Sequence, residues 1–358
     1  MLAVYVSGHG FGHATRTAEV LRAVRERAPR LSVTVCTQAP ASLFEAVVSQ
    51  PLSVRRVECD VGLVQKDALT IDEAATADAV GRFLAGWSER VASEARWLRA
   101  AGASVVLGDI PPLAFAAAAA AGLPSFGLAN FSWDWIYAHI GVRQPLLREA
   151  AQHAALAYRD AGLLLRLPFA GDLAAFPRIE DVPLVVRRPA VGKAEARRRL
   201  GLDERPVVLI SFGGLGLPGF ELAAFDGLRE YQLLLTTRVG EVRNLRRLES
   251  VDLAATGLDY PDLIGAADVV LSKPGYGIVT DCIGAGTRLV YTDRGDFPEY
   301  EVLVAEMPRY LPVAFVSNAD VRAGRLADPL RQVRARPFPS PPPLDGASVA
   351  ADRVLAGL

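Results

Sequence analysis

Short apolar runs alternate with segments of helical periodicity along most of the chain. In the first half, apolar runs predict strands at residues 2–6, 31–37, 53–59, 104–107 and 163–167, and helical patterns cover 17–27, 74–100 and 113–121. The second half repeats this order, with predicted strands at 207–212, 233–237, 268–272 and 288–292 and a last helix at 346–358. Because strands that alternate with helices form parallel sheets covered on both faces, we predict an α/β chain with two Rossmann-like halves and a cleft between them.

A change in composition near Asp181 predicts the boundary between the halves. The segment 181–206 contains prolines and a run of charged residues before the next apolar strand, which is typical of a hinge followed by a short helix. A second proline-rich stretch, at 337–343, precedes the last helix. We therefore predict a first domain over 1–185, a second over 186–340, and a C-terminal helix within 341–358 that returns to the first domain.

The composition is that of a globular protein and excludes several classes of partner. Of the 358 residues, 51% are hydrophobic and 22% are charged, and the net charge of −1 predicts neither nucleic acid nor an anionic membrane as the main partner. The abundant Ala and the preference for Arg over Lys are typical of a GC-rich bacterial gene. The 3 cysteines are scattered, so we predict neither a disulfide framework nor a zinc or other metal site.

The pattern of apolar residues also bears on location. The chain contains no signal peptide and no apolar run of the roughly 20 residues that a membrane span needs. We therefore expect a cytoplasmic protein without a transmembrane segment, although exposed apolar patches of the first domain leave peripheral membrane contact open.

A glycine-rich turn, SGHGFGHATR, follows the first predicted strand. Its glycines at 8, 10 and 12 do not match the dinucleotide-binding spacing, and no P-loop occurs in the chain. A turn of this kind before a helix still presents backbone N–H groups that favour an anionic ligand, or it serves backbone geometry alone. Two of the 4 histidines, His9 and His13, lie in this turn. Near-neutral titration suits His13 to act as a general base, and the alternative is that it satisfies backbone groups at the helix start.

Asp109 ends the predicted strand SVVLGD. If that strand neighbours the first one, the carboxylate emerges beside His13, where it can fix the tautomer of the imidazole and stabilise the imidazolium. The alternative is that Asp109 caps the turn before Pro111 and Pro112.

The second half contains a comparable turn in SKPGYGIVTDCIGAG, residues 272–286. Gly275 and Gly277 permit close approach to a helix start that can face a diphosphate, and Lys273 adds positive charge. Asp281 lies one helical turn beyond Gly277, where its carboxylate suits the paired hydroxyls of a ribose. The alternative is that this acid complements the helix dipole.

An aromatic cluster, FSWDWIYAH, covers residues 131–139. Trp133, Trp135 and Tyr137 are suited to stacking on sugar rings with the help of Asp134, but they are equally suited to a hydrophobic core, which we favour for at least one Trp.

These motifs resemble those of GT-B glycosyltransferases, in particular the nucleotide-sugar enzymes and the enzyme that adds N-acetylglucosamine in the lipid II pathway. A closer resemblance is to the N-terminal glycosyltransferase-like region of plant-type L-arabinokinases. It covers nearly the whole chain and rests on YVSGHGFGHATRTAEV, DALTIDEAA, NFSWDWIYA, DVPLVVRR and LSKPGYGIVTD. The resemblance implies a GT-B fold, with two Rossmann-like domains that face each other across a cleft. Kinase activity is not expected, because no glycine motif of the arabinokinase kinase domain is present.

The resemblance also implies roles for single residues. The catalytic base is expected at His13, oriented by Asp109, and the acid at Asp281 is expected to bind the donor ribose. The loop TDRGDFPEYE is expected to bind the donor sugar through Asp296 and Glu299, although many relatives have a Gln-containing version. The full set expected to bind the nucleotide sugar is Gly10, Gly12, Gly213, Gly214, Gly216, Leu258, Tyr260, Lys273, Gly275, Tyr276, Gly277, Asp281, Asp296 and Glu299. The set expected to bind the acceptor is His9, Arg16, Trp133 and Asp134.

The favoured hypothesis is inverting glycosyl transfer without a metal, since no DxD motif is present. The nucleoside-diphosphate sugar would be a substrate rather than a cofactor, and the acceptor would be a small molecule or a glycan. Two alternatives stay open. One is a non-catalytic module that binds a sugar or nucleotide sugar for a sugar kinase, and the other is nucleotide-sugar epimerisation on the same fold.

Overall fold

The computed structural model describes residues 1–45, 47–48, 52–66, 70–212, 225, 227–236, 245–247, 253 and 255–358. The chain divides into two compact units. The first comprises Met1–Val64, Asp72–Val185 and Pro343–Leu358, and the second comprises Gln65–Ile71 and Val186–Pro342.

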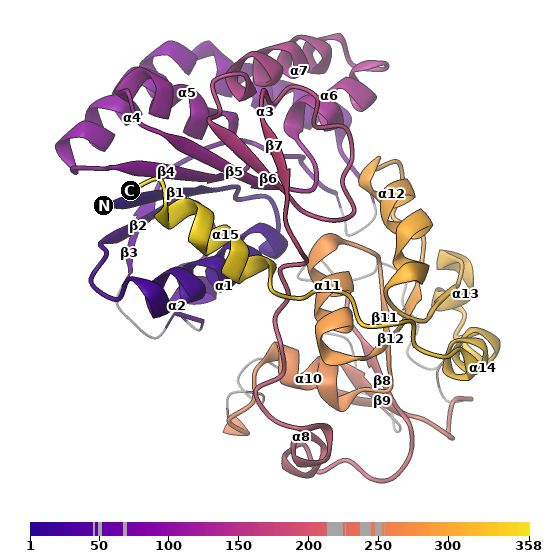
Figure 1. Cartoon of the computed structure of the whole chain (residues 1–358). Helices are drawn as coiled ribbons and strands as arrows, with labels where there is room; N and C mark the ends of the chain where they lie inside the picture. Colours follow the sequence, from indigo (N-terminus) through magenta and orange to yellow (C-terminus); the bar gives the residue numbers. More distant parts are fainter. Residues whose placement is uncertain are drawn as a thin grey trace. The chain divides into compact units, whose positions relative to one another are not determined.

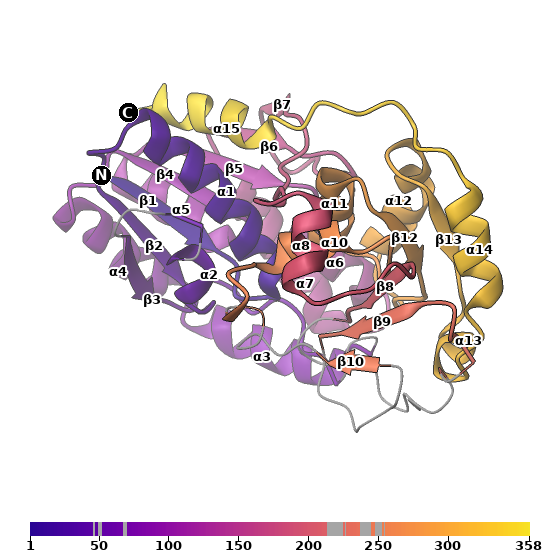
Figure 2. The same cartoon turned by 90° about the horizontal axis from the view of Figure 1, so that it is seen from below.

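The first unit is built on a parallel sheet with the strand order β3-β2-β1-β4-β5-β6-β7. Helices α3 to α7 cover one face of this sheet, and α1, α2 and α15 cover the other, where α15 packs on α1 (Figures 1 and 2). The described elements are β1 (Leu2–Val6), α1 (Phe11–Arg27), β2 (Val33–Thr37), α2 (Ser42–Glu45), β3 (Ser53–Arg56), α3 (Glu73–Ala85), α4 (Trp87–Ala100), β4 (Val105–Asp109), α5 (Pro112–Ala121), β5 (Ser125–Ala129), α6 (Trp133–Gly141), α7 (Pro145–Tyr158), β6 (Leu163–Arg166), β7 (Ile179–Asp181) and α15 (Gly346–Leu355).

The register of β1 and β4 determines where the first candidate site lies. All five residues of each strand are buried, as expected for central parallel strands, which are covered on both faces. Val6 pairs with Asp109, so both strands end at the same level, and the turn after β1 lies beside the carboxylate that ends β4. Ser7 continues this pairing, because its backbone N–H donates to the carbonyl oxygen of Asp109 at 2.8 Å.

Several predicted boundaries in this unit were wrong. The helix expected at 17–27 begins at Phe11, because Gly10 adopts a φ of 75° that leads the chain directly from the turn into the helix. The single helix expected over 74–100 is two helices, α3 and α4, separated at Gly86. The strand predicted at 163–167 is present as β6, but it is not the edge of the sheet. That place is taken by β7, a short strand without an apolar run, and its edge position explains why periodicity missed it.

The second unit contains a parallel sheet with the strand order β10-β9-β8-β11-β12-β13. Helix α10 packs against α8 and α11, whereas α14 packs on β11, β12 and β13 (Figures 1 and 2). The described elements are α8 (Lys193–Arg199), β8 (Val207–Ile210), β9 (Gln232–Leu235), β10 (Leu245–Arg247), α10 (Tyr260–Ala266), β11 (Val269–Ser272), α11 (Tyr276–Ala285), β12 (Arg288–Tyr291), α12 (Glu299–Glu306), the 3-10 turn η2 (Met307–Arg309), β13 (Val313–Phe315), α13 (Asn318–Arg322) and α14 (Ala327–Ala335).

The core of this second unit is mostly aliphatic, with the aromatic residues Phe212, Phe225 and Tyr231. Val208, Ile210, Leu271 and Val290 are each at most 1% exposed, and they join residues of α14 in one cluster. Across the described parts of both units, no helix has the length and apolar character that crossing a membrane requires.

Candidate active site

The first candidate site lies where β1 and β4 end and α1 begins. His13 is the third residue of α1, and its Nδ1 lies 2.8 Å from Oδ1 of Asp109. The imidazole is 6% exposed and packs edge-on against Phe131, with ring centroids 5.4 Å apart. Its Nε2 has no hydrogen-bond partner among the residues that the structure describes. The carboxylate therefore orients the ring through one nitrogen and leaves the other able to accept a proton.

Asp109 has other partners besides His13. Arg16 donates from Nε to Oδ2 at 2.7 Å and from Nη2 to Oδ1 at 2.5 Å, and Thr17 donates from Oγ1 to Oδ2 at 2.8 Å. The Nη1 of Arg16 donates to Oδ1 of Asn130 at 2.7 Å. Burial alone would raise the pKa of Asp109, but the Arg16 guanidinium and then His13 lower it more, to about 2. The carboxylate is therefore ionised at neutral pH.

This network changes the expectation for Arg16. The sequence predicted that it binds the acceptor, but its side chain is only 4% exposed and its three guanidinium nitrogens point to Asp109 and Asn130. In this structure the side chain therefore holds the carboxylate, and acceptor binding by Arg16 stays a prediction. Gly10 and Gly12, by contrast, lie at the exposed start of α1, where the first-turn N–H groups have no intrahelical partner.

His9 is held by the segment that follows β3. The backbone N–H of Leu63 donates to its Nδ1 at 3.2 Å, so the hydrogen of the neutral ring is on Nε2. Gly62, with a φ of 67°, leaves room for the imidazole, because a Cβ at this position would lie 2.5 Å from Cβ of His9. The ring packs edge-on against Trp133 at 5.4 Å. His9 is thus a half-buried side chain at the rim of the His13 site.

Trp133 lies inside the first unit. It is 0% exposed, it stacks on Tyr137 at 5.6 Å, and its Nε1 donates to Oδ2 of Asp60 at 2.8 Å. The preference for a core Trp in this cluster therefore holds for Trp133, which offers no open face to a sugar. Asp134 lies in the first turn of α6, where burial raises its pKa.

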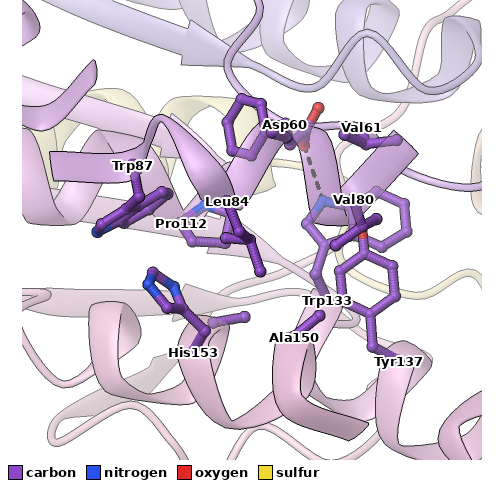
Figure 3. Close-up of a pocket in the computed structure, with 12 residues that line it drawn as sticks. Asp60, Val61, Val80, Leu84, Trp87, Pro112, Trp133, Tyr137, Ala150 and His153 are labelled. Atoms are coloured by element: carbon purple, nitrogen blue, oxygen red, sulfur yellow. Dashed lines mark hydrogen bonds between the residues drawn. The ribbon is translucent and has the colours of Figure 1, made fainter. Parts of the chain in front are cut away.

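Trp133 and Asp60 line a cavity bounded by apolar side chains of α3 to α7 (Figure 3). Its volume is about 20 Å³. Its lining includes the Asp60 carboxylate and the imidazole of His153, whose buried Nδ1 has no hydrogen-bond partner among the described residues. Burial raises the pKa of Asp60, although hydrogen bonds from Ser7 and Trp133 and the nearby His13 oppose the shift.

The second candidate site lies in the second unit, at the start of α11. This helix begins at Tyr276 with Gly275 as its N-cap, and its first turn contains no acidic residue. Lys273 and Gly277 are half-buried at this turn, and Tyr276 is buried. Asp281 lies in the second turn, so it does not complement the helix dipole from the first turn, as the alternative interpretation proposed.

The carboxylate of Asp281 is bound by Arg187, from the segment that follows the first domain. The guanidinium donates from Nε to Oδ1 at 3.0 Å and from Nη2 to Oδ2. Asp281 is 3% exposed, and its burial raises its pKa although Arg187 opposes the shift. Each carboxylate oxygen thus accepts one hydrogen bond from Arg187 and keeps a further lone pair for another donor.

Tyr260 lies next to this pair. The Arg187 guanidinium lies 5.5 Å from the centre of its ring, and its hydroxyl is 2.7 Å from Oγ of Ser211 at the end of β8. Tyr260 is the first residue of α10, and Leu258 is buried in the segment just before this helix. Tyr260 therefore borders the Arg187 and Asp281 pair.

The loop expected to bind the donor sugar begins after β12. Glu299 is the first residue of α12, is 2% exposed, and accepts a hydrogen bond from Nη1 of Arg294 at 2.5 Å. Asp296 is exposed. A Cβ at Gly275 would lie 3.6 Å from Nη1 of Arg294, so this arginine reaches the glycine-rich turn. The expected ligands Gly213, Gly214 and Gly216 lie outside the described residues.

Four residues missed by the sequence analysis take part in these two sites: Asp60, Asn130, Arg187 and Arg294. Asn130 and Arg187 lie within the motifs NFSWDWIYA and DVPLVVRR, so the resemblance contained a signal for them. Asp60 and Arg294 lie in loops, and the periodicity of apolar residues does not predict the position of a loop residue. Among the described residues, no group of three or more His, Cys, Asp or Glu side chains could hold a metal ion.

Comparison with known proteins agrees with the expected resemblance. The chain is 37% identical over 303 residues to an L-arabinokinase of Arabidopsis thaliana, a match that covers 84% of this chain and 29% of that protein. It is 32% identical over 171 residues to a UDP-N-acetylglucosamine–N-acetylmuramyl-(pentapeptide) pyrophosphoryl-undecaprenol N-acetylglucosamine transferase of Thermus thermophilus, a match that covers 44% of this chain and 49% of that protein. The chain thus spans less than half of the length of either relative. No family model matches the chain.

Solved structures support the architecture. The glycotransferase of kitacinnamycin is similar with a TM-score of 0.59 and 19% identity, over 100% of this chain and 98% of that protein. Two parallel sheets with helices, together with this likeness, confirm the predicted α/β class and the expected resemblance. The chain has the GT-B fold of the glycosyltransferases and is related in sequence to the plant L-arabinokinase.

Proposed function

We propose that this chain is a glycosyltransferase that moves a sugar from a nucleoside-diphosphate donor to an acceptor hydroxyl, with inversion and without a metal ion. The observation that supports this proposal most strongly is the distance of 2.8 Å between Nδ1 of His13 and Oδ1 of Asp109. In this proposal, Nε2 of His13 accepts the proton of the acceptor hydroxyl. The oxygen then forms a bond to the anomeric carbon, and the bond from that carbon to the diphosphate breaks, so the nucleoside diphosphate leaves with the electron pair. Asp109 stabilises the imidazolium that results.

Groups of the second unit would stabilise the negative charge on the leaving diphosphate. The first-turn N–H groups of α11, which has no acidic residue there, favour an anion, and Lys273 and Arg294 add positive charge near Gly275. Asp281 would bind the ribose beside Arg187 through the remaining lone pairs of its carboxylate, and Asp296 and Glu299 would contact the sugar. The glycines at 213, 214 and 216 remain expected diphosphate ligands. We further propose that the nucleotide sugar is a substrate, that no cofactor is needed, and that the protein is cytoplasmic.

A second candidate function has its own supporting observation. The relative with 37% identity is named an L-arabinokinase, and the match covers 29% of it. A module that binds a sugar or nucleotide sugar for a sugar kinase, without transferring it, is therefore the alternative. It would use the same residues around Asp281 but would not need Nε2 of His13 as a base.

Product analysis distinguishes the candidates. Nucleotide sugars are incubated with the protein and a panel of sugar, lipid and phenolic acceptors, in buffer with a chelator, and analysed by mass spectrometry and NMR. Transfer gives a free nucleoside diphosphate and a glycoside of inverted anomeric configuration. Epimerisation gives a new nucleotide sugar of unchanged mass. A nucleotide sugar that binds but stays intact under all conditions contradicts the proposal and favours the binding module.

A further inference from the structure

Arg16 shares one buried carboxylate with the candidate base. Its Nη2 and the Nδ1 of His13 both contact Oδ1 of Asp109, at 2.5 Å and 2.8 Å, and they lie 3.1 Å from each other. Arg16 is 4% exposed and Asp109 is 0% exposed. In such surroundings solvent screens charges weakly, so the guanidinium acts strongly on both neighbours.

The charges around His13 come from three elements. Asp109 ends β4, Arg16 lies one turn further along α1, and Asp60 lies after β3, near enough for His13 to act on its carboxylate. Thr17, Asn130 and Phe131 complete the surroundings with neutral groups. When His13 is neutral, the Arg16 cation and the Asp109 anion form a pair without net charge. When His13 is protonated, its positive charge lies beside the Arg16 cation, which is already paired with the same carboxylate.

A simple Asp and His pair would behave differently. A carboxylate with no other partner favours the imidazolium of its histidine, which would then have no free nitrogen to accept a proton near neutral pH. The guanidinium removes most of this preference, because it neutralises the carboxylate before the histidine is protonated. Asp109 can still orient the ring, because its Oδ1 lies within hydrogen-bond distance of Nδ1, at 2.8 Å.

We propose that Arg16 is a positioning residue that neutralises Asp109, so that the carboxylate orients His13 without holding it in the protonated form. The consequence for catalysis rests on the proposed function, in which His13 is the base. The arrangement of charges does not rest on it, and it can be measured in the protein without substrate. Arg16 itself touches neither the donor nor the acceptor in this proposal.

The test is an NMR titration of the histidine rings in the full chain. With 4 histidines in the sequence, the His13 signals are assigned by their loss in His13→Gln. Arg16→Lys keeps a cation beside Asp109, whereas Arg16→Gln keeps hydrogen bonding but removes the charge. The His13 signals are expected to titrate at least one pH unit higher in Arg16→Gln than in Arg16→Lys, a tenfold difference in proton affinity. Equal midpoints, or a lower one in Arg16→Gln, would overturn the proposal.

A second pair of variants serves if Arg16→Gln does not fold. Asp109→Asn leaves the Arg16 cation beside His13 without a carboxylate, and Asp109→Asn with Arg16→Gln removes both charges. The signals are expected to titrate at least one unit lower in the single variant than in the double variant. Equal midpoints here would also overturn the proposal. Neither comparison uses a substrate, so a failure of the proposed transfer reaction would appear in the product analysis and not in these titrations.

Discussion

The Nη2 of Arg16 and the Nδ1 of His13 lie 3.1 Å apart, and both face Oδ1 of Asp109. Arginine can only donate, so Oδ1 is the acceptor of the guanidinium. Because the ionised carboxylate can also only accept, we assign the hydrogen of the neutral imidazole to Nδ1, 2.8 Å from Oδ1, which leaves the lone pair on Nε2. This tautomer is the one that a base at His13 requires, and it follows from the surrounding network.

Replacement of His13 should therefore abolish most of the transfer activity but not the binding of the nucleotide. We expect His13→Gln to lower kcat by about 10²–10⁴-fold, the usual contribution of a positioned general base. His139→Gln is the matched control, since His139 lies in α6 and is not a partner of Asp109. Steady-state kinetics with any acceptor found by product analysis provide the measurement. Comparable activity in the two variants would exclude His13 as the base.

Replacing only one member of the buried ion pair of Asp109 and Arg16 should destabilise the folded protein. Asp109→Asn leaves a buried guanidinium without its carboxylate, which we expect to lower the free energy of unfolding by about 3–5 kcal/mol. Adding Arg16→Gln removes the unpaired charge, so the double variant should be more stable than the single one. Denaturant unfolding of the wild type, both single variants and the double variant measures this difference. Additive losses would mean that the two side chains are not energetically coupled.

The same carboxylate should make stability depend on acidic pH. The pKa of Asp109 is lowered to about 2 from an ordinary value of 3.8. A lowered pKa in the folded state stabilises the protein above the unfolded-state value, and this contribution is lost as pH falls from about 4 to about 2. It corresponds to roughly 2 kcal/mol. The loss should be smaller in Asp109→Asn than in the wild type, and unchanged in Asp160→Asn, which removes an exposed carboxylate. Equal losses in all three proteins would argue against an ionised, paired Asp109.

A side chain at Gly62 should destabilise the protein, because it would collide with His9. Gly62 and Gly122 adopt φ values of 67° and 74°, so an alanine at either position should cost about 1–2 kcal/mol in backbone strain. A Cβ at Gly62 would also lie 2.5 Å from Cβ of His9, whereas a Cβ at Gly122 has nothing within 4 Å. We therefore expect Gly62→Ala to destabilise the protein more than Gly122→Ala and to shift the NMR signals of His9. Equal losses of stability in the two variants would show that backbone strain alone accounts for the loss, and that Gly62 does not determine the position of the His9 side chain.

The fold could be predicted further than the sites. Central strands such as β1 and β8 are apolar runs buried on both faces, so periodicity found them, but β7 pairs at an edge through backbone contacts that leave no apolar signal. The proximity of His13 and Asp109 was predictable because parallel strands that neighbour each other end at one edge of a sheet. The partners Arg16 and Arg187 depend on side-chain directions and on a segment far away in the sequence. The sequence also did not show that Arg16 and Trp133 are buried, because burial depends on how the core packs.

The most direct test of the central claim is calorimetric titration of nucleoside diphosphates and nucleotide sugars into the wild type, which needs no knowledge of the acceptor. Asp281→Asn and Asp296→Asn compare a buried carboxylate at the expected ribose position with an exposed one in the expected sugar loop. We predict that one class of nucleotide binds, that Asp281→Asn weakens both the diphosphate and its sugar, and that Asp296→Asn weakens only the nucleotide sugar. Absence of binding for every nucleotide would contradict the assignment of a nucleotide-sugar site, and with it the proposed transferase.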